Sequence, residues 1–297
     1  MINLVSISGG KDSTATALLA IERGVENLRF VFCDTGNEHQ ITYDYVEYLG
    51  VKLKALCGIG IEILKADFAE KIAAKREKLL QDGDAERAEH LIATGNPFLD
   101  LAILKGRFPS TMARFCTTEL KVNVIKKVIA EALAAGEDVD SWVGIRAEES
   151  LKRSMMSERE LFFIDKDTNA EAWQYRPILK WNAQDCFAQL KRFEIDPNPL
   201  YKMGMGRVGC MPCINCRKGE LNQIARDFPE VIDRIRQWEK QVGLASRLHQ
   251  GTFFPMVNGC EGIDAQVAWA STSRGGKQYQ LDLEETTTCK SLYGLCE

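Results

Sequence analysis

Histidine is the scarcest metal-binding residue type in this sequence of 297 residues, which contains only His39, His90 and His249. None of the three lies beside the cysteine-rich segment at residues 210–216, so a zinc site of mixed cysteine and histidine ligands is poorly supported. Long apolar runs are also missing, and none approaches the roughly 20 residues that span a bilayer. The first five residues carry no basic group, so we interpret them as the start of a strand and not as a signal peptide.

Excess positive charge is missing as well, since the formal net charge is −4. Dedicated nucleic-acid-binding domains are usually basic, so this value argues against a broad polyanion-binding surface but permits a small basic groove. Hydrophobic residues make up 45% and charged residues 27%, as in ordinary globular proteins. Ten cysteines without a secretory signal indicate a reducing compartment. We therefore expect a cytoplasmic protein, with no membrane partner, whose thiols are available for metal or redox chemistry.

Strand-like and helix-like segments alternate along the first two thirds of the chain. Apolar runs at residues 2–7, 28–33, 61–64 and 141–146 predict strands, and segments at residues 13–23, from about 38, 119–133 and from 182 predict helices. This order predicts an α/β fold with a doubly wound, mostly parallel sheet. After Pro199 come clustered cysteines, helices and a glycine-rich tail. We therefore predict a nucleotide-binding domain at 1–200 and a Cys-rich C-terminal appendage at 201–297.

A glycine-rich turn joins the first predicted strand to the first predicted helix. Two adjacent glycines let the backbone turn tightly around an anion, and the helix directs its free amides and positive dipole end toward that anion. The dipole alone is worth only about 0.3–1 kcal/mol at an exposed site, so a polyphosphate needs the full charge of Lys11 as well. The spacing is not that of a Walker A loop. The alternative is an ordinary glycine turn before a helix. The candidate nucleotide-binding residues are Ser6, Ser8, Gly9, Gly10, Lys11, Asp12 and Ser13.

The second predicted strand ends in Asp34-Thr35-Gly36. In a doubly wound sheet, ligands bind beyond the carboxyl ends of the strands, so Asp34 and Gly36 are placed to meet the nucleotide or its Mg²⁺. The alternative role for Asp34 is capping the next helix. Arg146 follows a later strand, and its guanidinium has the fork geometry that suits phosphate or sulfate. The alternative there is a solvated charged loop.

Three cysteines, Cys210, Cys213 and Cys216, follow the pattern C-x2-C-x2-C. Thiolates at this spacing are able to converge on one metal centre, and the fourth ligand must come from elsewhere in the chain. Cys116 is our candidate, because it precedes a predicted helix and has basic neighbours. A 4Fe–4S cluster, a structural zinc ion and free redox thiols are the three alternatives, and the motif does not choose between the first two.

Together these segments resemble the phosphoadenosine-phosphosulfate (PAPS) reductase family in its broad sense, within the PP-loop ATP-pyrophosphatase superfamily. The turn matches the PP-loop motif S-G-G-x-D-S. Further matches, over residues 6–216, are Asp34-Thr35-Gly36, Arg114-Phe115-Cys116-Thr117, Gly144-Ile145-Arg146 and Pro199-Leu200-Tyr201 running into Arg207-Val208-Gly209-Cys210. The resemblance implies a fold like that of the adenine nucleotide α-hydrolases. It also implies that the loop cradles pyrophosphate and that the segment around Arg146 helps to hold the nucleotide. The C-terminal tail resembles phage-encoded members.

The sequence departs from the assimilatory reductases of that family in three respects. Those enzymes usually have a degraded loop, whereas Gly9 to Asp12 are intact here. They carry a C-terminal E-C-G-[IL]-H motif that is missing here, and their adenylylsulfate type uses a paired Cys-Cys where Cys116 stands alone. The resemblance and these departures favour an enzyme that cleaves ATP to AMP and pyrophosphate and adenylates a substrate for sulfur transfer. Lys11, Asp12 and Asp34 are its candidate catalytic residues, and ATP, Mg²⁺ and a 4Fe–4S cluster its expected cofactors.

Two other functions remain as alternatives: a sulfonucleotide reductase that forms sulfite, and a non-catalytic module that senses a nucleotide or a cluster. The acceptor is not readable from the sequence, and a sulfur-donor protein or a nucleic-acid acceptor is left open, as is the oligomeric state. A reductase would need Cys289 or Cys296 as its nucleophile. The carboxylates beside Cys296 disfavour a reactive thiolate there. We therefore expect neither cysteine to form a thiosulfonate, and we expect the tail to pack on the core or to close the active site.

Overall fold

The computed structural model describes residues 1–255, 261–272, 291–293 and 295. In this part of the chain six strands form one sheet with the order β3-β2-β1-β4-β6-β5. All neighbouring pairs are parallel except β5 with β6, which is antiparallel. The predicted α/β fold with a mostly parallel sheet is therefore confirmed. The strands are β1 (Ile2–Ile7), β2 (Leu28–Asp34), β3 (Ile61–Lys65), β4 (Val139–Trp142), β5 (Arg159–Ile164) and β6 (Glu171–Tyr175).

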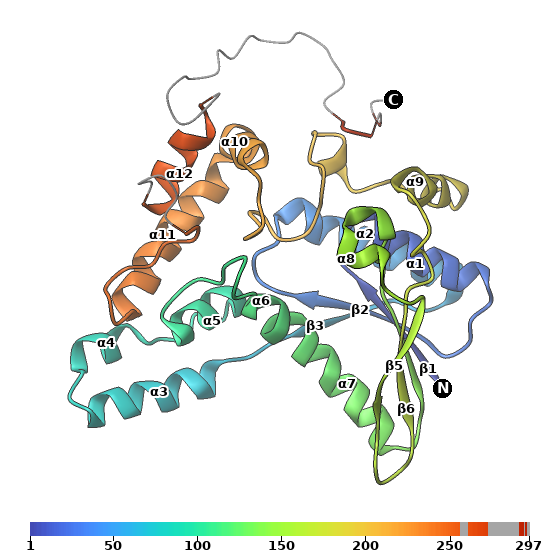
Figure 1. The fold of residues 1–297 in the computed structure, drawn as a ribbon, viewed down its shortest axis with the longest axis horizontal. Helices are drawn as coiled ribbons and strands as arrows, with labels where there is room; N and C mark the ends of the chain where they lie inside the picture. The colour runs from blue at the N-terminus through green and yellow to red at the C-terminus, as the bar shows by residue number, and fades with distance from the viewer. Residues whose placement is uncertain (256–260, 273–290, 294, 296–297) are drawn as a thin grey trace.

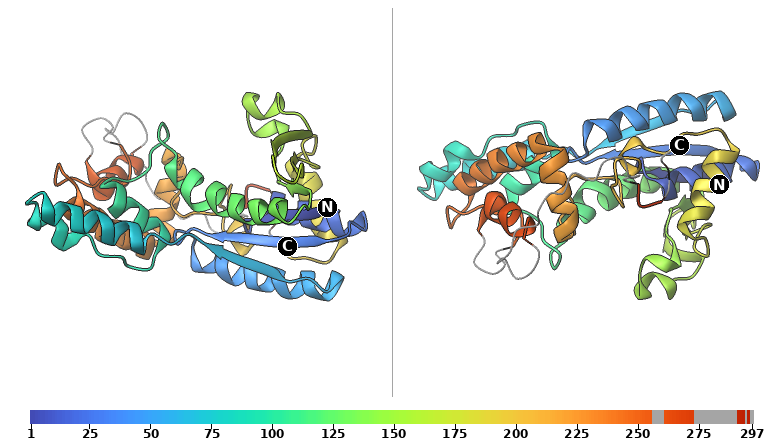
Figure 2. Two further views of the ribbon diagram at one scale, coloured as in Figure 1. Left: turned by 90° about the horizontal axis from the view of Figure 1, so that it is seen from below. Right: turned by 90° about the horizontal axis from the view of Figure 1, so that it is seen from above.

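Helices cover both faces of the sheet, as Figure 2 shows for the helices α2 and α7. Because side chains alternate along a strand, Val5 and Ile7 of β1 pack on one face while Leu4 packs on the other. Phe30 and Val31 of β2 divide in the same way. The first face is covered by α1 (Lys11–Glu22), α2 (Gln40–Cys57) and α9 (Ala183–Arg192), and the second by α7 (Asn123–Ala134).

A second group of helices lies beside the sheet, on the left in Figure 1. Its core is aromatic: the Phe98 ring stacks on those of Trp238 and Phe253 at centroid distances of 5.7 and 5.8 Å. This core draws side chains from both sides of residue 200, and the predicted domain boundary there stays a prediction. The helices are α3 (Ala69–Gln81), α4 (Ala85–His90), α5 (Pro97–Lys105), α10 (Lys218–Asp227), α11 (Pro229–Ala245) and α12 (Gly262–Ala270).

Short helical segments lie between the longer elements, and some element boundaries differ from the sequence prediction. The fourth strand ends at Trp142 and not at residue 146, because the next residues leave the sheet to pass the glycine-rich turn. The β5–β6 hairpin was not predicted. The short elements are α6 (Phe115–Thr117), the π-helix η1 (Thr118–Val122), η2 (Ala147–Glu149), α8 (Leu151–Ser154) and η3 (Pro199–Tyr201). Every helix in the described stretches is too short or too polar to cross a membrane.

Candidate nucleotide-binding site

The glycine-rich turn lies where β1 ends and α1 begins, as predicted. Gly9 has a φ of +73°, and a Cβ there would lie 2.9 Å from the Thr42 side chain, so only glycine fits. Ser13 fastens the turn, because its hydroxyl accepts a hydrogen bond from the Ser8 amide (3.0 Å) and donates one to the Gly10 carbonyl (3.0 Å). Ser6 Oγ is buried and has no hydrogen-bond partner among the described residues. The turn is therefore a preformed loop with a free hydroxyl beside it.

Lys11 is the first residue of α1, and its side chain is only 5% exposed. Its ammonium lies 3.3 Å from Asp12 Oδ2 and faces two aromatic rings, Tyr201 at 5.4 Å and Tyr293 at 5.1 Å from the ring centroids. The Lys11 amide also donates to the Tyr201 hydroxyl at 3.1 Å. In this conformation the protein's own side chains surround the Lys11 ammonium, which the sequence predicts to bind a phosphate group.

Asp12 joins the loop to Arg146. The Arg146 Nε lies 2.5 Å from Asp12 Oδ1, and the guanidinium also pairs with Glu148. Arg146, expected to hold a phosphate or sulfate, is thus bound by two carboxylates here, while its predicted role in nucleotide binding stays a prediction. The buried Cys186 thiol lies 3.4 Å from the same Asp12 oxygen, and burial together with Asp12 raises the pKa of Cys186.

Two further segments hold the loop in place, and neither was predicted from the sequence to do so. Asn198 donates through Nδ2 to the Gly9 carbonyl at 3.2 Å, three residues before Tyr201. Gly144 lies against the loop from the other side, where a Cβ would come within 2.7 Å of the Asp12 carbonyl carbon. The only available signal was that Pro199-Leu200-Tyr201 and Gly144 belong to segments shared with the family, without a stated function.

Replacing Gly144 with alanine is expected to destabilise the protein by about 1–3 kcal/mol, because the new methyl group overlaps the backbone of Asp12 and Ser13. Urea unfolding monitored by circular dichroism measures the change. Gly219→Ala is the matched control, since nothing lies within 4 Å of that position in α10 and alanine favours a helix. Equal stabilities of the two variants would contradict the close packing of Gly144 on the loop.

The Asp34 turn lies at the carboxyl end of β2, next to the loop at the end of β1. Gly36 has a φ of +77°, and a Cβ there would overlap the Asn96 amide. Asp34 Oδ1 accepts from the Gly36 amide at 2.9 Å and from the Tyr43 hydroxyl at 2.7 Å. Lys65 Nζ lies 3.9 Å from the other oxygen of Asp34. Burial, helped by the nearby carboxylates of Glu38 and Asp34, raises the pKa of Tyr43 and keeps its hydroxyl a donor.

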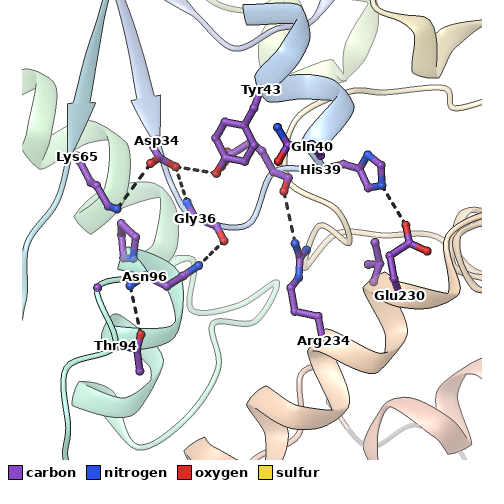
Figure 3. Close-up of a pocket in the computed structure, with 14 residues that line it drawn as sticks. Asp34, Gly36, His39, Gln40, Tyr43, Lys65, Thr94, Asn96, Glu230 and Arg234 are labelled. Atoms are coloured by element: carbon purple, nitrogen blue, oxygen red, sulfur yellow. Dashed lines mark hydrogen bonds and ion pairs between the residues drawn. The ribbon is translucent and has the colours of Figure 1, made fainter. Parts of the chain in front are cut away.

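A cavity of about 660 Å³ opens beside Asp34, between the sheet and α11 (Figure 3). Its volume suits a small-molecule ligand. Arg234 of α11 crosses it and donates to the Asn37 side chain at 3.1 Å. His39 and Glu230 form a second link across it at 3.2 Å. The cavity therefore offers both charge signs and several amide and hydroxyl groups. Its lining includes Asp34, Gly36, Gln40, Tyr43, Lys65, Thr94, Asn96, Glu230 and Arg234.

The segment with three cysteines is attached directly to the Asp34 turn. Glu38 and Cys210 form an antiparallel β-bridge, the Met211 amide donates to the Asn37 carbonyl at 2.7 Å, and Asn37 Nδ2 donates to the Pro212 carbonyl at 2.9 Å. The Cys210 thiol lies 3.6 Å from the buried Glu38 carboxylate. Burial and Glu38 raise the pKa of Cys210 to about 12. In the absence of a metal this thiol is thus protonated at neutral pH.

The four predicted cluster ligands are neighbours. Cys213 is close enough to Cys116, Cys210 and Cys216 for its charge to contribute to raising the pKa of each, after the larger effect of burial. Among the described residues, however, no three cysteine, histidine or carboxylate side chains converge at metal-binding distance. The donor set therefore fits an iron–sulfur or zinc site in kind and neighbourhood, while ligand geometry would require the thiols to turn toward a common centre.

Part of the C-terminal tail packs on the glycine-rich loop, in line with the expectation from the sequence. The Tyr293 hydroxyl donates to the Gly206 carbonyl at 2.7 Å, and its ring contacts those of Phe187 and Tyr201 at centroid distances of 5.1 and 5.7 Å. Tyr293 thereby covers Lys11. Cys289 and Cys296, the two cysteines weighed as nucleophiles, lie outside the described residues.

The sequence of residues 2–216 matches the family model described as "Phosphoadenosine phosphosulfate reductase domain". The chain belongs to the PAPS reductase family. Both the glycine-rich loop and the three-cysteine segment fall within the matched residues, so both are parts of the family domain. The family resemblance drawn from the motifs is thereby confirmed.

Several relatives share this sequence pattern. An uncharacterized 37.8 kDa protein of Escherichia phage 186 is 41% identical over 332 aligned positions, which cover 100% of this chain and 97% of that protein. The adenosine 5'-phosphosulfate reductase of Burkholderia cepacia is 28% identical over 152 positions, 50% of this chain and 52% of that enzyme. Among solved structures, the PAPS reductase of Candida auris has a TM-score of 0.42 at 14% identity, covering 72% of this chain and 83% of that chain.

Replacing Tyr293 with alanine is expected to tighten adenine-nucleotide binding by this family member about threefold to tenfold, the size of one cation–π contact. The ring covers the Lys11 ammonium, so a phosphate must displace it before reaching that charge. Calorimetric titration with α,β-methylene-ATP, in which the α–β linkage is not cleavable, measures the affinity. Leu292→Ala is the control in the same tail, because Leu292 is 70% exposed. Weaker binding by the Tyr293 variant would contradict displacement and make the ring part of the nucleotide site.

Proposed function

We propose that this PAPS reductase family member cleaves ATP between the α and β phosphates and adenylates an acceptor, as a step toward sulfur transfer. The observation that carries the proposal is the complete glycine-rich loop, in which Lys11 and Asp12 occupy the turn that Gly9 makes possible. A protein that only bound a sulfonucleotide would have no need for a charge that neutralises departing pyrophosphate. The motif at residues 8–13 thus favours ATP cleavage over simple nucleotide binding.

The proposed reaction is a displacement at the α phosphorus. An oxygen of the acceptor attacks this phosphorus, the bond to the oxygen that bridges to the β phosphate breaks, and pyrophosphate leaves with the bonding electrons. Lys11 and the free amides at the start of α1 would hold that pyrophosphate. Asp12 and Asp34 are the carboxylates that we propose for Mg²⁺, which would supply further neutralisation of the phosphates. Catalysis of this kind depends mainly on positioning and charge.

Arg146 would change partners in this scheme. Its guanidinium is now held by Asp12 and Glu148. A bound triphosphate competes with those carboxylates for the same fork of donors, and Mg²⁺ competes with Arg146 for Asp12. We propose that the cavity beside Asp34 receives the part of the nucleotide or acceptor that extends beyond the loop. Its polar lining and its volume of about 660 Å³ support that placement.

We further propose that Cys116, Cys210, Cys213 and Cys216 hold a 4Fe–4S cluster, with structural zinc as the alternative. The cluster would supply a site for carrying or positioning sulfur, or would be structural. The support is the shared neighbourhood of the four thiols and the bridge from Cys210 to Glu38, which places them beside the Asp34 turn. A reducing cytoplasm would suit such thiols, and the seven cysteines of the described residues are all free.

A sulfonucleotide reductase is the second candidate, and the similarity to proteins named adenosine 5'-phosphosulfate reductase favours it. In that reaction a cysteine thiolate attacks the sulfur of adenylylsulfate, the bond from this sulfur to the phosphate oxygen breaks, and AMP leaves. The cysteine is left as a thiosulfonate, from which a thiol reductant liberates sulfite. The sequence lacks the E-C-G-[IL]-H motif that provides this cysteine in the assimilatory enzymes. We therefore rank it below ATP cleavage.

Product analysis distinguishes the two candidates. The protein is incubated with [α-³²P]ATP, Mg²⁺ and candidate acceptors, and the products are separated by thin-layer chromatography. AMP with pyrophosphate, or an adenylated acceptor, is expected, whereas ADP with phosphate would reject the proposal. In parallel, intact mass is measured after mixing with adenylylsulfate or phosphoadenylylsulfate. A sulfite adduct on Cys289 or Cys296 would favour the reductase, and we expect none.

A further inference from the structure

A second cavity, of about 880 Å³, lies in the helical part of the molecule, at the far end of α5 and α11 from the nucleotide site. The first cavity touches the beginnings of these two helices, at Asn96 and Glu230, and the second touches their ends, at Lys105 and Ala245. In Figure 1 the end of α11 lies next to α4 and α3. The two cavities are therefore separate, with the α5–α11 pair between them.

Positive charge dominates this second cavity, although the whole chain has a net charge of −4. Among its described lining residues, one carboxylate, Glu261, is accompanied by five basic side chains that come from four different segments of the chain. Ser110, Gln250 and Thr252 add hydroxyl and amide groups to the lining. The five basic residues are Lys75, Arg87, Lys105, Arg107 and Arg247.

Among the described residues, most of this charge has no carboxylate partner. Arg87 pairs with Asp84 at 3.2 Å, and Lys105 lies 3.6 Å from Glu119. Lys75, Arg107 and Arg247 have no carboxylate within ion-pair distance in the described part of the chain. Burial, and then repulsion from Arg87 and Lys105, lowers the pKa of Lys75. Positive groups gathered without partners repel one another, so the fold gives up stability by placing them together.

Capping of helix ends accounts for only part of this arrangement. Basic side chains often contact the free carbonyls at helix C-termini, and Lys75 does so by donating to the Leu104 carbonyl at 2.5 Å. Arg107 instead lies over the Phe115 ring at 5.7 Å. Arg247 is exposed, two residues beyond the end of α11, without a carbonyl contact in the described structure. These two guanidinium groups remain available to a ligand.

We propose that this basic cavity binds a ligand that carries two or more phosphate groups, at a site separate from the glycine-rich loop. Guanidinium groups bind phosphate oxygens in pairs, and hydroxyl and amide groups complete such sites. Cations from several segments suit a chain of phosphates better than one isolated anion. The shared chemistry belongs both to a small polyphosphate and to a short stretch of single-stranded nucleic acid, and the experiment separates these two sources.

The test uses the full-length protein with Lys11→Ala as background, so that the glycine-rich loop contributes little to binding. Inorganic tripolyphosphate is titrated by calorimetry, and a fluorescein-labelled single-stranded oligonucleotide by anisotropy at several salt concentrations. Arg107→Gln/Arg247→Gln is compared with Lys126→Gln/Lys127→Gln, which removes the same charge from the exposed side of α7. The Arg107→Gln/Arg247→Gln variant should bind tripolyphosphate or the oligonucleotide, whichever the Lys11→Ala protein binds, at least about tenfold more weakly. For the oligonucleotide, the slope of log affinity against log salt concentration should correspond to about two fewer neutralised phosphates.

Each outcome supports or overturns the proposed site for a ligand with several phosphate groups. Tripolyphosphate binding that only the cavity variant loses supports a small polyphosphate, and oligonucleotide binding lost in the same way supports nucleic acid. Binding of neither probe, or equal weakening in the cavity and control variants, overturns the proposal. Thermal melts by circular dichroism confirm that both double variants are folded. AMP formation is measured in the same double variants with Lys11 retained, so that failure of the ATP-cleavage proposal is scored separately.

Discussion

Lys11→Ala is expected to reduce AMP formation by roughly a hundredfold or more, the usual cost of removing one group that stabilises charge in a transition state. Lys11 is the one full positive charge inside the loop motif of residues 8–13, and the helix dipole contributes only about 0.3–1 kcal/mol. Nucleotide affinity should fall as well, because the same ammonium faces the phosphates before and after cleavage. Rapid-quench measurement of AMP and calorimetric titration with α,β-methylene-ATP, in which the α–β linkage is not cleavable, separate the two effects.

A control at the same position separates the effect of the charge from the effect of its placement. Lys11→Arg keeps the charge, but its planar head must fit between the Tyr201 and Tyr293 rings, which now lie 5.4 and 5.1 Å from the ammonium. Retained nucleotide affinity with lowered turnover in that variant would indicate that the position of the charge matters for the chemical step. AMP formation by Lys11→Ala at the wild-type rate would reject the loop as the catalytic site.

Single alanine substitutions at Cys116, Cys210, Cys213 and Cys216 are each expected to reduce bound iron from about four atoms per chain to a small fraction of that value. Without a metal, Cys210 is a protonated thiol beside a buried carboxylate, because burial and Glu38 raise its pKa to about 12. A bound metal replaces that proton, so metal loading should also release protons. Anaerobic purification followed by iron, sulfide and zinc analysis measures the content.

Cys186→Ala and Cys57→Ala are the matched controls for the cysteine series. Cys186 is buried on α9 beside Asp12, and Cys57 donates to the Leu53 carbonyl at 3.2 Å, so neither belongs to the three-cysteine segment. Both variants should keep their metal. Stoichiometric zinc without iron in the wild-type protein would replace the 4Fe–4S assignment by the structural-zinc alternative.

The sequence was most informative where local chemistry decides the structure. The apolar runs at residues 2–7 and 28–33 became central strands, and the helix predicted from residue 182 is α9, whose start is capped by Asn182 and Asp185. Adjacent glycines before Lys11 indicated the loop, because few residues fit a φ of +73°. The β5–β6 hairpin was missed, although Asp165 to Asn169 contain the residues of a turn. Its strand β5 is exposed along its whole length and lacks the alternation that marks a half-buried strand.

Contacts between distant segments were beyond the reach of sequence patterns. Tyr201 and Asn198 hold the loop from almost 190 positions away, and no spacing rule connects them with Lys11 or Gly9. The pairing of Arg146 with Asp12 depends on where β4 leaves the sheet, four residues earlier than predicted. The basic cavity collects its charges from four separate segments, so the overall net charge of −4 concealed it.

The β-bridge between Glu38 and Cys210 makes the Asp34 turn and the three-cysteine segment one mechanical unit. If a metal orders that segment, it also favours one position of the turn, and a nucleotide that prefers this position binds more tightly to the loaded protein. Thermodynamic reciprocity then requires the nucleotide to strengthen metal binding by the same free energy. Occupancy of one site would thus change the affinity of the other, and metal-binding constants measured with and without nucleotide give the coupling free energy.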